Sequence, residues 1–492
     1  MFLLGLDVGS TGCKAAVFDA DGVCHGFGYR EYDIETDETG KAEQDADKIW
    51  DITKEVAAQT IHSSGSKEIK AIAVSVQGDS SIPVDKNFNP LSKALLGMDY
   101  RSAPQAERFA EKLGNIDLFK KTGMRSHPLN AAVKTAWLKE TSPNIYEKAH
   151  KIVTYADFIL GKLGAEPTID FSMASRSGVF DLEKREWSGE IIEAFGLDKE
   201  KFSRPCASGL SVGRIAPKMA EFLGVSKDVM LVTGGHDQTC AGIGAGLISE
   251  GPALLSTGTA EVLSTAFDRP RLTDVMYESY YPCYIHAKPE MYFTFALNHV
   301  GGVLLKWYRD NLGRPEGSYE SIINNVPEGP SRVMVLPHFN GSGTPWCDMD
   351  SKGAIVGMSM STTRHDIVRA ILESQTYELR INVERMGDAG IPVSGLIAAG
   401  GGAKSSLWLQ IRADVLNCPV RTLRVREAAC LGAAILAGTA AGVYASIDEG
   451  VKKTVAFEKE YKPRSEMTEK YEERYQLYQE LYPTMRTFNR KL

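Results

Sequence analysis

The stretches LDVGSTGCKAAVFD, residues 6–19, and LLSTGTAEVLS, residues 254–264, repeat one design: an apolar run, a turn of glycine with serine or threonine, and a second apolar run. This pattern predicts two strands joined by a tight turn. The backbone N–H groups and hydroxyls of such a turn can meet phosphate oxygens. Because each hairpin opens its own half of the chain, the pair predicts a protein that holds a polyphosphate from two sides.

The residues around the first hairpin predict an α/β lobe. Apolar runs indicate strands at residues 2–7 and 13–19, and a third strand follows an Asp-Gly turn. Apolar residues at helical spacing come next, at residues 49–57, and then the β-rich run IKAIAVSVQG, residues 69–78. An antiparallel meander, a helix and a further strand form the opening of a ribonuclease-H-like lobe.

The second hairpin opens a comparable lobe. Its expected elements are strands at residues 291–297 and 395–398 and helices at residues 302–310, 364–386, from Lys404, 427–439 and 467–482. The alanine-rich helix at 427–439, broken by Gly432, is expected to pack closely against a sheet. The last helix carries charges of both signs and meets Pro483, which predicts a surface helix that ends there. A boundary in the glycine-rich segment 234–251 gives lobes of residues 1–246 and 247–492 with a cleft between them.

Composition excludes several classes of protein. A chain of 492 residues, 43% hydrophobic and 24% charged, is long enough for two cores. A formal charge of −7 without a basic run argues against nucleic acid as a partner. The apolar start meets Asp7 too early for a signal peptide, and no stretch reaches the roughly 18 apolar residues of a membrane helix. The scattered cysteines lack metal-ligand spacing, which favours reduced thiols in a cytoplasmic enzyme.

The segment TGGHDQTCAGIGAG, residues 233–246, supplies a carboxylate for the cleft. Asp237 follows a strand and a Gly-Gly pair and precedes a helix of small residues, so the turn can present it between the lobes. A carboxylate there can accept the proton of an attacking hydroxyl. The alternative is a carboxylate that only helps to bind metal or sugar. His236 is expected to be a structural neighbour.

The first hairpin turn can hold a metal and a phosphate together. Asp7 ends a strand and can hold Mg²⁺, while Ser10 and Thr11 can meet phosphate oxygens and Lys14 adds a cation. An ordinary hairpin turn is the alternative for this segment alone.

A third glycine-rich segment, LIAAGGGAKSSLWLQIRADVL at residues 396–416, predicts a strand, a turn and a helix. Its glycines let the backbone pass close to a flat ligand or a phosphate. GGGAKSS is not a P-loop, because Lys404 follows alanine and the spacing between glycines is wrong. Residues 242–246, GIGAG, likewise lack the spacing of a dinucleotide fingerprint.

In this order the motifs resemble the FGGY carbohydrate kinases, members of the actin, hexokinase and heat-shock ATPase superfamily, over nearly the whole chain. KTAWLKE, residues 134–140, and GAIVGMSMSTTRHDIVRAILE, residues 353–373, match the family's two signatures. The resemblance implies two ribonuclease-H-like lobes around a cleft and an ATP- and Mg²⁺-dependent kinase. It implies Asp237 as the catalytic base and Gln238 as a substrate contact. For the metal and nucleotide it implies Asp7, Ser10, Thr11, Lys14, Gly258, Thr259, Gly302, Lys306, Gly401, Gly402 and Ser405.

The sugar pocket departs from the family's better-known types. Glycerol kinases carry Asn-Gln-Arg-Glu where this chain has Val-Gln-Gly-Asp, residues 76–79, and the missing arginine argues against glycerol. Bacterial xylulose kinases often carry Gly-Gln-Met-His there and Trp-x-Asp-x-Arg later; GMDYR, residues 97–101, keeps only the acid and the arginine. Four residues are expected to contact the sugar hydroxyls: Gln77, Asp79, Asp99 and Arg101. The alternative is that they are merely polar residues in surface loops.

The resulting hypothesis is a kinase of a small polyhydroxy compound, with Asp237 taking the proton of a terminal hydroxyl as its oxygen attacks the γ-phosphorus of ATP. A ketopentose such as xylulose is the first choice, and a sugar acid such as gluconate is the runner-up. A non-catalytic sugar- or nucleotide-binding protein is disfavoured because Asp7 and Asp237 are both present. A heat-shock-type chaperone is disfavoured because the C-terminus offers no β-domain. A homodimer is left open.

Overall fold

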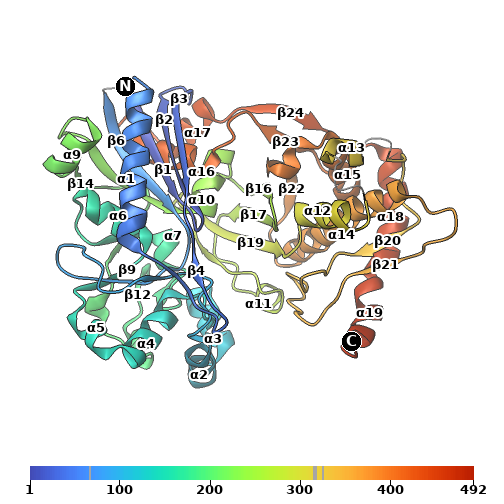
Figure 1. Ribbon diagram of the computed structural model, residues 1–492, viewed down its shortest axis with the longest axis horizontal. Helices are drawn as coiled ribbons and strands as arrows, with labels where there is room; N and C mark the ends of the chain where they lie inside the picture. Colours follow the sequence, from blue (N-terminus) through green and yellow to red (C-terminus); the bar gives the residue numbers. More distant parts are fainter. Residues whose placement is uncertain (66–67, 314–317, 324–325) are drawn as a thin grey trace.

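The computed structural model describes residues 1–65, 68–313, 318–323 and 326–492. Two large mixed sheets, one in each half of the chain, dominate this described part (Figure 1). No helix within the described ranges is both long and apolar enough to cross a membrane.

The first sheet runs in the order β14, β15, β6, β1, β2, β3. Its strands are β1 (Phe2–Val8), β2 (Gly12–Asp19), β3 (Cys24–Glu31), β6 (Ile69–Val76), β14 (Ser211–Arg214) and β15 (Met230–His236). The first three strands form the expected antiparallel meander, and β6 and β15 continue the sheet parallel to β1.

The second sheet runs in the order β18, β19, β17, β16, β22, β23, β24. Its strands are β16 (Gly251–Thr257), β17 (Glu261–Phe267), β18 (Tyr284–Ile285), β19 (Tyr292–Asn298), β22 (Val393–Gly400), β23 (Val420–Leu423) and β24 (Phe457–Tyr461). Strands β16, β17 and β19 repeat the antiparallel meander, and β22 and β23 are parallel to β16. Both lobes therefore have the predicted α/β topology.

Helices cover both faces of the sheets. In the first half they are α1 (Ala46–Ser63), α2 (Ala103–Leu113), α3 (Asn115–Thr122), α4 (Ala131–Thr141), α5 (Pro143–Lys148), α6 (Tyr155–Leu163), α7 (Phe171–Ala174), α8 (Gly189–Ala194), α9 (Pro217–Leu223) and α10 (Asp237–Ala245). In the second half they are α11 (Asp274–Glu278), α12 (Gly302–Asn311), α13 (Tyr319–Ile323), α14 (Arg364–Asp388), α15 (Ser406–Leu416), α16 (Ala428–Ala440), α17 (Ile447–Thr454), α18 (Ser465–Gln479) and α19 (Leu481–Asn489).

Shorter strands extend the lobes away from the two main sheets. They are β4 (Glu35–Thr36), β5 (Ala42–Gln44), β7 (Ile82–Val84), β8 (Ala94–Leu95), β9 (Lys151–Val153), β10 (Thr168–Asp170), β11 (Phe180–Asp181), β12 (Glu186–Trp187), β13 (Arg204–Cys206), β20 (Met334–Leu336) and β21 (Ala354–Val356). Of these, β4, β5 and β8 form a small sheet of their own beside the first lobe.

Alternate residues of the first sheet enter different cores. Leu4 and Leu6 of β1 pack with α1, whereas Leu3 packs with residues of α16. Helix α16 belongs to the second half of the sequence but covers one face of the first sheet, next to α10 (Figure 1). The expected packing of this helix against a sheet is confirmed by its contacts with β1 and β6, whereas Gly432 faces helix α10: a Cβ added there would lie 1.8 Å from the carbonyl oxygen of Cys240.

The prediction for the last helix is wrong in two respects. Residues expected to form one surface helix form α18 and α19, and Pro483 lies in the first turn of α19 instead of ending a helix. A proline is tolerated there because the first-turn N–H groups have no partner within the helix. Three tyrosines of α18 are also buried, because they line the face that packs toward α14 and α15: Tyr471, Tyr475 and Tyr478.

Candidate functional site

The carboxyl ends of parallel strands gather the acidic residues of the first lobe. Val8 and His236 both pair with Val76 across adjacent parallel strands. Parallel strands in register end at the same edge of a sheet, and ligands of open α/β sheets bind at that edge. Asp7 and Asp237 therefore lie at one edge, each beside the end of its strand.

Asp237 is the first residue of α10, and its environment favours the protonated form. Burial raises the pKa of this carboxyl to about 7, with the negative charge of Asp7 adding to the rise and the positive charge of Arg176 opposing it. The side chain keeps 33% of its surface exposed, so a ligand can still reach it. A carboxyl with a pKa near neutrality suits proton transfer.

His236 has the features of a structural neighbour. Its Nε2 lies 3.2 Å from Oδ1 of Asp237, and its Nδ1 lies 3.3 Å from the hydroxyl of Tyr284. Its backbone N–H donates to the hydroxyl of Ser172 over 2.9 Å. Burial, reinforced by the charge of Arg176, holds the pKa of His236 well below its usual range, so the imidazole is neutral.

The first phosphate turn is braced by two glutamines. Gln77 donates through Nε2 to the carbonyl of Gly9 over 3.3 Å and to Oε1 of Gln44 over 3.2 Å. Gln44 in turn donates to the carbonyl of Ser10 over 2.7 Å. Gln77, expected to read sugar hydroxyls, thus has its amide nitrogen committed to the turn that carries Ser10 and Thr11.

Asp7 and Lys14 face each other across the first hairpin. The hydroxyl of Ser75 donates to Oδ1 of Asp7 over 2.8 Å. Burial raises the pKa of Asp7, although the charge of Lys14 and the Ser75 hydrogen bond act in the opposite direction. Nζ of Lys14 lies 2.8 Å from Oε2 of Glu427, the residue before α16, so the turn is tied to the second half of the chain.

The second phosphate turn is assembled from three separated segments. The N–H of Gly301 donates to the carbonyl of Thr259 over 2.7 Å, and that of Gly302 donates to the carbonyl of Gly258 over 2.8 Å. From the other side, a Cβ added at Gly402 would lie 2.7 Å from Cβ of Thr257. The structure therefore brings Gly258, Thr259, Gly302, Gly401 and Gly402 together, and their role toward a nucleotide stays a prediction.

The two other residues predicted to contact the nucleotide lie at the start of α15 and on α12. Ser405 caps α15, and its hydroxyl accepts the N–H of Trp408 over 3.3 Å. Lys306 is an exposed residue of α12, the helix that starts at Gly302.

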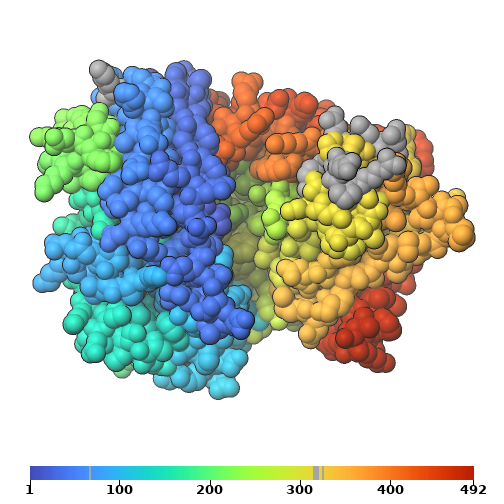
Figure 2. Space-filling view, in the orientation of Figure 1, coloured from blue at the N-terminus to red at the C-terminus, as the bar shows by residue number. Residues whose placement is uncertain are grey.

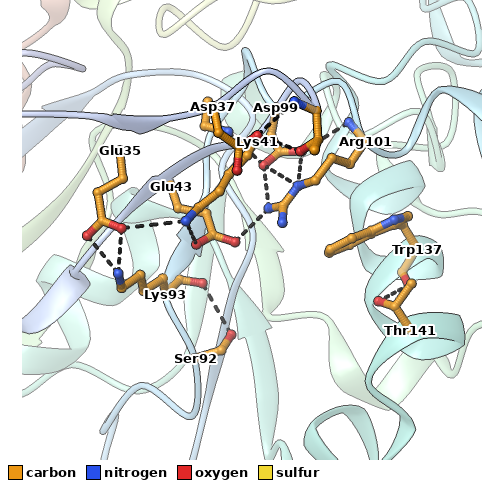
Figure 3. Close-up of polar contacts among 12 residues, drawn as sticks. Glu35, Asp37, Lys41, Glu43, Ser92, Lys93, Asp99, Arg101, Trp137 and Thr141 are labelled. Carbon is orange, nitrogen blue, oxygen red and sulfur yellow. Dashed lines mark hydrogen bonds and ion pairs between the residues drawn. The ribbon is translucent and has the colours of Figure 1, made fainter.

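Asp99 and Arg101 bind each other instead of projecting as separate side chains (Figure 3). Arg101 donates through Nη2 to Asp99 and to Glu43, each over 2.6 Å. Asp99 also accepts the N–H of Ala42 over 2.9 Å and is only 2% exposed. The guanidinium carbon of Arg101 lies 4.5 Å from the centre of the Trp137 ring. These contacts hold the loop after β8 in place. The expected role of Asp99 and Arg101 in binding a sugar stays a prediction.

The surface is hollowed between the two lobes, with atoms from the middle of the chain at its floor (Figure 2). A hydrogen bond joins the residue after Asp237 to the second sheet. The hydroxyl of Ser264 on β17 donates to Oε1 of Gln238 over 3.4 Å. Asp237 is therefore placed at the junction of the lobes, next to Gln238.

Comparison with known proteins gives the family. The models of the N-terminal and C-terminal domains of the FGGY family of carbohydrate kinases match residues 2–244 and 253–441. The chain belongs to the FGGY family of carbohydrate kinases. Kinases of this family use ATP as the phosphate donor.

Relatives of this carbohydrate kinase extend over nearly its full length. The xylulose kinase of Bacillus subtilis is 26% identical, covering 100% of this chain and 98% of the relative. The gluconokinase of the same organism is 27% identical, covering 91% and 89%. The solved structure of a ligand-bound xylulose kinase from Lactobacillus acidophilus has a TM-score of 0.91 at 23% identity, covering 100% and 99%, which shows the fold.

The donor set of this carbohydrate kinase fits Mg²⁺ that is bound mainly through phosphates. No group of three or more His, Cys, Asp or Glu side chains in the described residues could hold a metal ion alone. Mg²⁺ is usually bound through one or two carboxylates, water and substrate phosphates. One carboxylate, Asp7, beside a phosphate-binding turn matches that pattern.

Several residues of this site were not predicted from the sequence. Gln44 braces the first turn, and the positive charge of Arg176 acts on Asp237. Arg412, fully buried, contacts Glu261 and donates to the hydroxyl of Thr257 over 3.0 Å behind the second turn. Nothing in the local sequence around these polar residues distinguishes them from surface positions, because their partners lie far away along the chain.

Proposed function

We propose that this carbohydrate kinase transfers the γ-phosphoryl group of ATP to a terminal hydroxyl of a ketopentose, with xylulose as the leading single candidate. The observation that carries this proposal is Asp237 at the carboxyl edge of the first sheet, on a helix whose next residue, Gln238, accepts a hydrogen bond from Ser264 of the second sheet. The xylulose kinase relatives, which align over the whole chain, support the choice of sugar.

In the proposed mechanism Asp237 accepts the proton of the acceptor hydroxyl as that oxygen attacks the γ-phosphorus. N–H groups of the first turn, with Lys14, and of the second turn, around Gly258 and Thr259, bind and orient the phosphates. Mg²⁺ held near Asp7 would add positive charge to the transferring phosphoryl group. Closure of the cleft excludes water, which would otherwise compete as nucleophile.

A sugar acid such as gluconate is the second candidate acceptor. The gluconokinase relative supports it, with nearly the same identity as the xylulose kinase. Both acceptors carry a terminal hydroxyl, so the same base and the same phosphate turns would serve either one. A cytoplasmic location and a homodimer belong to the same proposal, and the free cysteines fit a reducing compartment.

A coupled assay of ATP consumption with a panel of ketoses, polyols and aldonic acids tests the proposal. We expect turnover with one acceptor in the wild type. Asp237→Asn or Asp237→Ala is expected to lower kcat by about 10²- to 10⁴-fold, because a positioned general base contributes that much. Turnover by Asp237→Ala at the wild-type rate would exclude Asp237 as the base. Absence of turnover with every acceptor would favour a non-catalytic binding protein.

A further inference from the structure

Arg176 is a buried cation next to Asp237. It follows α7, and its side chain is only 4% exposed. Its Nη2 donates to Oδ2 of Asp79, a residue that is also buried and has a φ of 65°. Because non-glycine residues seldom adopt this left-handed conformation, Asp79 is held in an unusual backbone position that presents its carboxylate to the guanidinium.

Two donors of Arg176 are left over. Within the described residues, no acceptor meets hydrogen-bond geometry with Nε or Nη1, although both atoms are buried and the guanidinium lies close enough to act on the Tyr284 hydroxyl. A buried donor without a partner costs about 1–3 kcal/mol, and more when it is charged, so native proteins seldom leave one unsatisfied. Both N–H groups therefore lack an acceptor, which water or a bound ligand would supply.

The guanidinium of Arg176 lies against two aromatic rings of the other lobe. Its central carbon lies 4.9 Å from the ring centre of Tyr284 and 5.8 Å from that of Phe295, and both rings belong to the second sheet. Arg176 comes from the first lobe, so its side chain spans the junction at which Asp237 lies. Its charge also acts on Asp237 itself, where it lowers the pKa.

Gly78 lies against the spare donor. A Cβ added at Gly78 would lie 3.2 Å from Nε of Arg176 and 2.9 Å from Nε2 of His236. A side chain at this position would crowd both nitrogens. The glycine is thus compatible with a guanidinium that faces a ligand beside the base.

We propose that Arg176 is an acceptor-binding residue, and that its Nε and Nη1 donate to hydroxyl or carbonyl oxygens of an uncharged sugar or polyol. The inference rests on the proposed function and names the class of acceptor. The acceptor is uncharged because Asp79 already neutralises Arg176, so the guanidinium offers hydrogen-bond donors without a net positive charge for the carboxylate of a sugar acid. Lys134, the other buried cation near Asp79, is committed to the carbonyl oxygens of Pro128 and Leu129.

Arg176→Lys is the sharpest test, because lysine can keep the ion pair with Asp79 but lacks the two spare donors. We expect KM for the best uncharged acceptor to rise about tenfold or more, with kcat and KM for ATP nearly unchanged. This pattern follows when the lost contact binds the acceptor equally well in the ground state and in the transition state. Arg369→Lys is the matched control, since Arg369 is an equally buried arginine paired with Glu373 away from the cleft. The control is expected to leave the acceptor KM unchanged.

A second variant covers failure of Arg176→Lys to fold. Asp79→Asn with Arg176→Gln removes both charges together, and its acceptor KM is expected to rise by a similar factor, with folding checked by circular dichroism.

An unchanged acceptor KM in a folded variant overturns the inference and shows that only water satisfies Arg176, while the kinase activity stands. Preference of the wild type for an aldonate over every uncharged acceptor overturns the acceptor class. Absence of turnover in the wild type overturns the proposed function and this inference together.

Discussion

Asp237 shows how the tertiary environment sets the chemistry of a single residue. An ordinary carboxyl is ionised near neutral pH, but burial and the charge of Asp7 bring the pKa of Asp237 to about 7, against the influence of Arg176. A carboxylate with so high a pKa is a stronger base than an exposed one. The same shift leaves a large fraction of the free enzyme protonated at neutral pH.

The pH dependence of the reaction follows from this shift. Because only the ionised carboxyl can accept a proton, we expect kcat/KM for the acceptor to fall about tenfold per pH unit below about 7 and to level off above it. The measurement is a pH series of kcat/KM at saturating ATP. An acid limb that begins only below about pH 5 would indicate a carboxyl of ordinary pKa and contradict the described environment.

At the scale of elements, the packing of α10 against α16 depends on glycine. The two helices come from different halves of the sequence and meet where Gly432 faces the carbonyl of Cys240 and Gly244 faces that of Ala428. Cβ atoms added at the two glycines would lie 1.8 Å and 1.9 Å from those oxygens. Asp237 begins α10, so this contact also sets the position of its carboxyl group.

Gly432→Ala is expected to destabilise the protein. The added methyl group must push α16 away from α10, and overpacking of this kind costs about 1–3 kcal/mol. Gly387→Ala is the matched control, since no atom lies within 4 Å of its added Cβ in α14. There alanine should stabilise the helix by about 0.5–1 kcal/mol. Thermal unfolding of both variants measures the difference, and equal melting temperatures would contradict the close contact.

At the scale of the whole molecule, the two lobes are not independent units of the chain. Leu3, Phe18 and Val232 of the first sheet share a buried cluster with Leu431 and Ile435 of α16. The ion pair of Lys14 with Glu427 adds a polar tie at the same junction. The first sheet is therefore completed by a helix from the second half of the sequence.

A fragment of residues 1–246 is expected to expose the face of the first sheet that α16 covers. It should aggregate or bind a hydrophobic dye strongly, because a large exposed apolar surface is rarely tolerated in a monomer. Adding residues 247–492 as a separate chain should reduce dye binding and restore ATP-dependent turnover. A fragment that is monomeric and unfolds cooperatively without its partner would show that α16 is dispensable for the first lobe.

The sequence determined the elements and the order of the motifs. Local patterns were sufficient for the hairpins at residues 6–19 and 254–264, for the strand that precedes Asp237 and for the alanine-rich helix with Gly432, because strand alternation, glycine turns and helical spacing are properties of neighbouring residues. The resemblance of those motifs to the FGGY kinases was confirmed by both family models. The site residues themselves stay predictions, although the structure gathers the glycine turns.

Only the tertiary structure decided which polar side chains meet. Arg176 lies 97 positions from Asp79 in the sequence, and Gln44 lies 33 positions from Gln77. It also decided that Pro483 lies in the first turn of a helix instead of ending one, and that the tyrosines of α18 are buried. Burial, and the pKa shifts and unpaired donors that it produces, depends on atoms from distant segments. No pattern of adjacent residues encodes these contacts, because the chain must fold before the partners come within reach of each other.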